Sequence, residues 1–166
     1  MAFRMRQEVE DWFKHISKKE PLATKFDLYY LCLMMGLATS RCDPFQGSTE
    51  FVDNFVADYK PVQRLIIGLL MIAEMSLNGI DLKDTIKTQE LINVYIDPTQ
   101  SSHLREMGFG RLNGYANGGF NVILETLEEK PRQVESFLQW YSQTLSQKAT
   151  KNKLWADIAL GLKSTL

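Results

Sequence analysis

The sequence predicts one compact, all-α domain of about seven helices that spans residues 1–166. Apolar residues recur every three or four positions along most of the chain, which is the period of an α-helix. Prolines and the Asn78-Gly79 pair fall where these periodic stretches end, as helix boundaries require. The composition is 45% hydrophobic and 23% charged, which is ordinary for a globular domain large enough to build its own core.

The first half of the chain contains four of the expected helices. Glu20-Pro21 ends the first, and Thr24 can cap the second. The second helix is apolar nearly all round from Leu28 to Leu37, so we expect it to be central. A turn-rich loop at 42–47 precedes a short helix capped by Ser48 or Thr49 and bearing Phe51, Phe55 and Tyr59. Pro61 then opens a mostly apolar helix that runs to Leu77.

The second half continues the helical pattern. Asp81 or Asp84 opens a helix whose apolar residues begin with Ile86 and which Asp97-Pro98 ends. Its β-branched run from Leu91 to Ile96 leaves a strand as the alternative. After a glycine-broken segment, residues 112–127 read as helix, and Pro131 starts another. The last helix, from about Thr150, has the inward-facing residues Leu154, Trp155, Ile158 and Leu162.

Charge and cysteine content favour a cytoplasmic protein outside the membrane. The segment Met1–Glu20 is charged throughout and lacks the apolar core of a signal peptide. The longest apolar run, Leu65–Ala73, is much shorter than the roughly 20 residues of a membrane span. Two cysteines, Cys32 and Cys42, are too few to staple a domain of this size. The net charge of −1 argues against coating of nucleic acid by overall charge, but it allows a local basic patch.

The chain shows no recognisable catalytic, metal-binding or cofactor-binding set, so we expect a protein that is not an enzyme. His15 and His103 are its only histidines, and they lie in unrelated contexts, whereas a metal site needs three or four convergent ligands. Cys42 beside Arg41 could have a reactive thiol, but a small structural residue is the simpler interpretation. The carboxylates near Glu125 and Glu128 alternate with basic residues, which is typical of a solvated helix face. A divergent nuclease using them is the remaining enzymatic alternative.

The segment 108–120 is unusually rich in glycine. Gly110, Gly114 and Gly118 recur every four residues, as do Asn113, Asn117 and Asn121. On a helix this spacing makes a flank without side chains, bordered by amides, and glycine there permits close backbone approach. Close packing inside the domain, docking of a partner protein, and a phosphate contact are the three interpretations. The six residues are our predicted partner-binding set.

Basic residues gather at both ends of the sequence. The early ones include Lys14, Lys18 and Lys19, and the late ones include Lys163. If the termini meet, these residues would form a basic rim able to contact DNA phosphates. The predicted nucleic-acid contacts are Arg4, Arg6, Lys148, Lys151 and Lys153.

Two segments resemble small accessory proteins of prokaryotic phage-defence loci. Phe26–Leu37 (FDLYYLCLMMGL), followed by Arg41, looks like their early helix. Leu112–Leu124 (LNGYANGGFNVIL) is similar to their later helix, and its Tyr-Ala-Asn-Gly-Gly string is the most specific part. The resemblance is to the Dnd-system-associated family found beside DNA phosphorothioation genes, and more distantly to the small middle subunit of Lamassu-type SMC defence complexes. It implies an accessory subunit and carries over no catalytic residue.

From these observations we expect a non-enzymatic adaptor subunit of an antiphage defence complex. It would dock onto a larger ATPase, SMC-like or nuclease subunit, and it would contact DNA through the complex. The alternative is a small DNA-binding module that uses its basic terminal helices.

Overall fold

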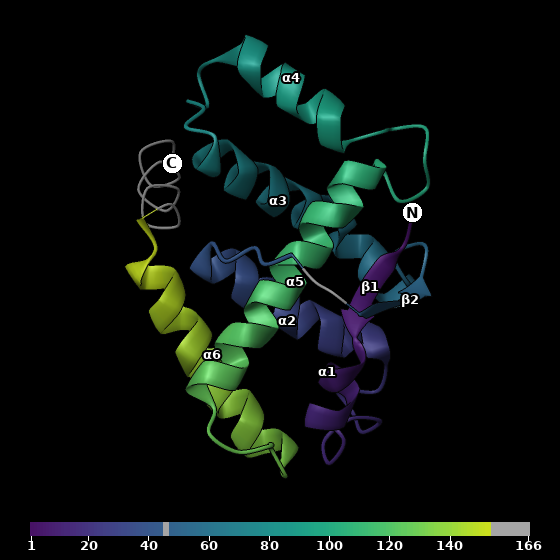
Figure 1. Cartoon of the computed structure of the whole chain (residues 1–166), viewed down its shortest axis with the longest axis vertical. Helices are drawn as coiled ribbons and strands as arrows, with labels where there is room; N and C mark the ends of the chain where they lie inside the picture. Colours follow the sequence, from purple (N-terminus) through teal and green to yellow (C-terminus); the bar gives the residue numbers. More distant parts are fainter. Residues whose placement is uncertain (45–46, 154–166) are drawn as a thin grey trace.

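The computed structural model describes residues 1–44 and 47–153, and it is predominantly helical (Figure 1). Helices hold 62% of the residues, so the predicted helical class is confirmed, although a two-stranded sheet accompanies the helices. Six α-helices take the place of the expected seven or so within the described part. The elements in chain order are β1 (Phe3–Arg6), α1 (Gln7–Trp12), α2 (Lys25–Thr39), β2 (Ser48–Val52), the 3-10 helix η1 (Ala57–Val62), α3 (Gln63–Leu77), α4 (Thr85–Tyr95), α5 (Glu106–Thr126) and α6 (Val134–Lys151).

The small sheet occupies two places where helices were predicted, and those predictions are wrong there. Residue 3 belongs to β1, and residues 48–52 of the helix predicted over 48–59 belong to β2. β1 pairs with β2 in antiparallel register, with Met5 opposite Thr49 and Arg6 opposite Ser48. Burial in β1 alternates, because Phe3 and Met5 face the core while Arg4 faces solvent. That period of two belongs to a strand. Only residues 7–12 of the predicted first helix are helical, and η1 follows β2 where the short helix was expected.

The helices α2 and α5 cross at the centre of the molecule (Figure 1). Thr24 caps α2 through a capping box with Asp27, as its position predicted. The crossing is a backbone contact, since a methyl group at Gly36 would overlap the Tyr115 carbonyl and one at Gly119 would overlap the Cys32 carbonyl. Ten of the fifteen residues of α2 are buried, which confirms that it is central.

An aromatic cluster fills the core between the sheet and these two helices. The Phe3 ring lies 5.1 Å from Phe26, 4.9 Å from Phe55 and 5.0 Å from Phe109, all edge-on. Such edge-to-face pairs add about 0.5–1.5 kcal/mol each beyond the apolar area that they bury. One strand residue therefore joins α2, the loop after β2 and α5.

The other helices lie around this pair with small shifts from the predicted bounds. Pro61 lies inside η1, and α3 begins two residues later. Asp84 caps α4, so residues 91–95 are helical and the strand alternative is wrong. α5 begins at Glu106, within the segment that its glycines had seemed to break. The predicted last helix, with Leu154, Trp155, Ile158 and Leu162, falls mostly outside the described residues. Among those described, no helix has the length and apolar character needed to cross a bilayer.

Candidate functional site

The glycine flank of α5 lies against the chain that follows α2. A methyl group at Gly114 would stand 2.6 Å from the Cys42 Sγ, and one at Gly118 would overlap the Arg41 carbonyl. The N–H of Asp43 donates to the Gly114 carbonyl at 3.0 Å. The missing side chains thus let residues 41–43 run along α5 in backbone contact. Gly110 differs, because it is exposed and nothing lies within 4 Å of its Cβ position.

Asn113 binds the N-terminal strand from inside the core. Its Oδ1 accepts the Arg4 N–H and the Tyr29 hydroxyl, both at 3.0 Å, and its Nδ2 donates to the Ala2 carbonyl at 3.0 Å. The residue is 3% exposed, so these bonds satisfy polar atoms that water cannot reach. A buried amide with this many partners is unavailable to another protein.

Asn117 and Asn121 continue the same row and hold Arg6 and Asp43. Arg6 donates to Asn117 Oδ1 at 3.2 Å and to Asn121 Oδ1 at 2.8 Å. Its guanidinium also lies 4.8 Å from the centre of the Phe120 ring, in cation–π geometry. Asn117 Nδ2 donates to the Asp43 carbonyl, and Asn121 Nδ2 donates to the Asp43 carboxylate. Of the six residues predicted to bind a partner, five therefore make contacts within the domain.

The residues that lie against these glycines, Arg41–Asp43, are not arranged for nucleophilic chemistry. Burial raises the pKa of the Cys42 thiol to about 11, so it is protonated at neutral pH. Arg41 lies between Asp43, 2.7 Å away, and Glu125, 2.8 Å away. The Glu125 hydrogen bond, with help from Asp43, raises the pKa of Arg41. Glu125, one of the two carboxylates named for the nuclease alternative, is thus held in an ion pair with Arg41.

A buried carboxylate, Glu74, joins α3, α4 and α5. Its Oε1 accepts from Arg111 Nε at 2.8 Å and from the Tyr115 hydroxyl at 3.0 Å, and its Oε2 accepts from the Tyr95 hydroxyl at 2.9 Å. Glu74 is 2% exposed, so these donors take the place of the water molecules that would solvate an exposed carboxylate. Burial, reinforced by the Glu74 charge, raises the pKa of Tyr115. Each oxygen is occupied by donors from neighbouring helices, an arrangement that fastens helices together.

The predicted basic set divides into two groups that lie on opposite sides of the molecule. β1 with Arg4 and Arg6 lies on one side of α5, and the end of α6 lies on the other (Figure 1). Arg4 is paired with Glu50, and Arg6 with Glu8. By contrast, Lys148, Lys151 and Lys153 form no ion pair within residues 1–44 and 47–153. Within residues 1–44 and 47–153, the two groups therefore do not form the continuous rim that was predicted.

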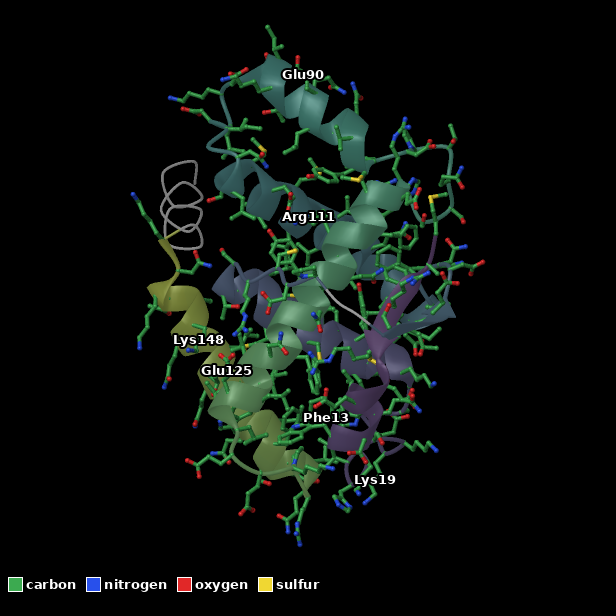
Figure 2. The ribbon with its side chains drawn as sticks, viewed as in Figure 1. Phe13, Lys19, Glu90, Arg111, Glu125 and Lys148 are labelled. Carbon is green, nitrogen blue, oxygen red and sulfur yellow. The ribbon has the colours of Figure 1, made fainter. Side chains whose placement is uncertain are left out.

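A groove of about 530 Å³ separates the end of α6 from α2 and α5. Figure 2 shows Lys148 and Glu125 as neighbours on this flank. Asn152 closes one end, donating to the Ala38 carbonyl at 2.8 Å and to the Ser40 hydroxyl at 2.9 Å. The groove is lined by Thr39, Ser40, Arg41, Val122, Glu125, Thr126, Lys148, Lys151 and Asn152.

Exposed apolar side chains gather at the end of the molecule formed by α3, α4 and the start of α5. We call this the α4 end (Figure 1). Seven large hydrophobic residues are exposed in the described chain, and all except Met1 lie between positions 65 and 107. α4 itself buries only Tyr95. The six exposed residues of this end are Leu65 (59%), Leu77 (53%), Leu82 (68%), Ile86 (73%), Val94 (45%) and Met107 (56%).

Neither Glu74 nor the α4 end was identified from the sequence as a feature of interest. Glu74 carried a signal, since it is the one charged residue from Leu65 to Leu77. Ile86 was predicted to belong to an apolar helix face, and its exposure could not be predicted from spacing. Comparison of the chain with family models, curated proteins and solved structures found no match. Within the described ranges, no three His, Cys, Asp or Glu residues converge as metal ligands would.

Proposed function

We propose that this chain is a non-enzymatic adaptor subunit that docks onto a larger protein through its α4 end. The observation that supports the proposal is the concentration of exposed apolar side chains between residues 65 and 107. Large apolar side chains exposed on neighbouring helices cost solubility, and such surfaces commonly mark a protein interface. Leu82 and Ile86 are the strongest candidates for the contact, being 68% and 73% exposed.

The charges around this end favour a protein partner over a membrane or nucleic acid. Residues 77–107 contain five carboxylates, at positions 81, 84, 90, 97 and 106, against three basic side chains, at 83, 87 and 105, which is a net charge of −2. Such a surface repels anionic lipid headgroups and phosphate backbones. The complementary partner is an apolar protein surface with a basic rim.

The defence context of the proposal rests on the two segments that resemble accessory proteins of phage-defence loci. In this fold those segments are α2 and the main part of α5, which form the central crossing. The Tyr-Ala-Asn-Gly-Gly string includes Gly119, where α5 touches α2. The segments that carry the resemblance thus form the central crossing, and the docking surface that we propose lies outside them. We propose as partner the larger ATPase, SMC-like or nuclease subunit of such a complex.

The test combines co-expression with the introduction of two negative charges at the α4 end. The tagged chain is produced with the products of its neighbouring genes, and the co-purified subunit is identified by mass. Leu82→Glu with Ile86→Glu should abolish that complex while the isolated variant melts at the wild-type temperature, because both side chains are already mostly in water.

A matched control is Gln143→Glu with Gln147→Glu, which adds the same charges at the same spacing on exposed positions of α6. This control should keep the complex. Retention of the complex by the Leu82/Ile86 variant, or equal loss in both variants, would refute docking through the α4 end. Metal-dependent cleavage of DNA or nucleotides that follows the purified protein would refute the adaptor role itself.

A further inference from the structure

The groove beside the end of α6 carries an excess of positive charge that the other described residues do not offset. Within its lining, Arg41 and Glu125 neutralise each other through an ion pair at 2.8 Å. Lys148 and Lys151 remain without a carboxylate partner among the described residues, and exposed Lys153 follows two residues later. The whole chain has a net charge of −1, so this local excess stands out against its surroundings.

A second lysine-lined hollow of the described surface does not have this excess to the same degree. It measures about 230 Å³ and lies between α1 and the start of α2. There Lys25 is paired with Glu10 at 2.7 Å, and Lys14 faces Asp11 at 3.8 Å. Two of its three lysines are therefore already balanced by carboxylates of α1.

We propose that the α6 groove binds the phosphodiester backbone of nucleic acid through Lys148, Lys151 and Lys153. On the opposite wall the Ser40 hydroxyl accepts from Asn152 and keeps its own hydrogen to donate to a phosphate oxygen, whereas the Thr39 and Thr126 hydroxyls donate to carbonyls of their own helices. The lysines are mobile point charges, and Arg41, the one guanidinium of the groove, is committed to Asp43 and Glu125. A small anion needs fixed, convergent donors, whereas a polyanion is held by charge density along its length.

The end of α6, where the groove lies, and the α4 end are at different parts of the molecule (Figure 1). An adaptor with this arrangement holds its protein partner at one end and the nucleic acid on the flank of α6. The inference does not depend on the proposed docking, because it concerns the isolated chain. It contains three of the five predicted nucleic-acid contacts and excludes Arg4 and Arg6, which are bound to other residues of the domain.

The test measures binding of the purified chain to a fluorescein-labelled DNA by fluorescence anisotropy over a series of salt concentrations. Neutralisation of three phosphates predicts a slope of log K against log salt of about −3 for a duplex and about −2 for a single strand. Replacing Lys148, Lys151 and Lys153 by glutamine should weaken binding by about tenfold or more and flatten the slope.

The matched control replaces Lys14, Lys18 and Lys19 by glutamine, which removes the same charge from the segment that follows α1. This control should bind as the wild type does, and circular dichroism should show that both variants are folded. Absence of salt-dependent binding by the wild type would overturn the proposal. Equal loss in both variants would reduce the effect to net charge, and loss in the control alone would move the site to α1. Full competition by inorganic phosphate at equal charge concentration would also overturn the assignment to a polymer backbone.

Discussion

A single methyl group added at Gly119 should weaken the crossing of α2 and α5 and destabilise the fold. In Gly119→Ala the new Cβ would overlap the Cys32 carbonyl and would stand too close to the Gly36 nitrogen. Both obstacles are backbone atoms of a buried helix, so no side chain can rotate out of the way. Relief requires that one central helix move away from the other.

The expected loss follows from two opposing effects. Overpacking of a close-packed site costs about 1–3 kcal/mol, and backbone obstacles place this site at the upper end. Replacing a helical glycine by alanine returns about 1 kcal/mol. The net loss is about 2 kcal/mol, which lowers Tm by roughly 4–8 °C in a chain of this size.

Gly110→Ala is the matched control, since the same change occurs on the same helix where nothing lies within 4 Å. It should raise Tm by about 2–4 °C, because only the gain in helix propensity remains. Thermal unfolding followed at the helical circular dichroism band measures both variants. If Gly119→Ala melts at or above the wild-type temperature, the backbone contact does not hold these helices together.

Two other predictions concern buried ionisable groups. Glu74→Ala removes the acceptor shared by Arg111, Tyr95 and Tyr115, so it should lower the free energy of unfolding in urea by about 3 kcal/mol. Glu90→Ala, which removes an exposed carboxylate of α4 (Figure 2), should leave that free energy almost unchanged. Equal values for the two would mean that Glu74 contributes no net stability. Burial raises the pKa of Cys32 from 9.0 to about 12 and that of Cys42 from 9.0 to about 11. The unfolded chain therefore loses these protons first, and the stability that is present below pH 9 should fall as the pH rises from 9 to 11, by about 1.4 kcal/mol per unit for the buried Cys32 and by less for the partly buried Cys42. Cys42→Ser should remove its share of that slope, and an unchanged slope would show that the thiol is not buried as described.

The helices were predictable where local signals agree with the final packing. α2 combines a Thr24 cap, a preceding proline and a long apolar run, and all three act within the helix itself. β1 could not be found in this way, because four residues show too little of a two-residue period. Its partner strand lies more than forty positions away, so the pairing depends on the finished fold.

The candidate sites show the same division. The four-residue spacing placed Gly114 and Gly118 on one flank of α5, and the structure does place both against the chain after α2. Spacing cannot say whose backbone approaches, since an internal and an external neighbour require the same glycine. It likewise grouped Ile86 with the apolar face of α4 but could not reveal that this residue is left uncovered.

The central position of α5 also has a consequence for synthesis. The N-terminal strand reaches its final environment only when Phe109 stands beside Phe3 and Asn113 binds Ala2 and Arg4. α2, which is apolar on almost every side, needs the same late helix to cover it. A ribosome adds about 5–20 residues per second, and domains acquire stable structure as complete units. The emerging chain therefore presents an uncovered α2 for several seconds, until residues near 120 leave the exit tunnel. During that time the chain is a natural client for chaperones that bind apolar segments.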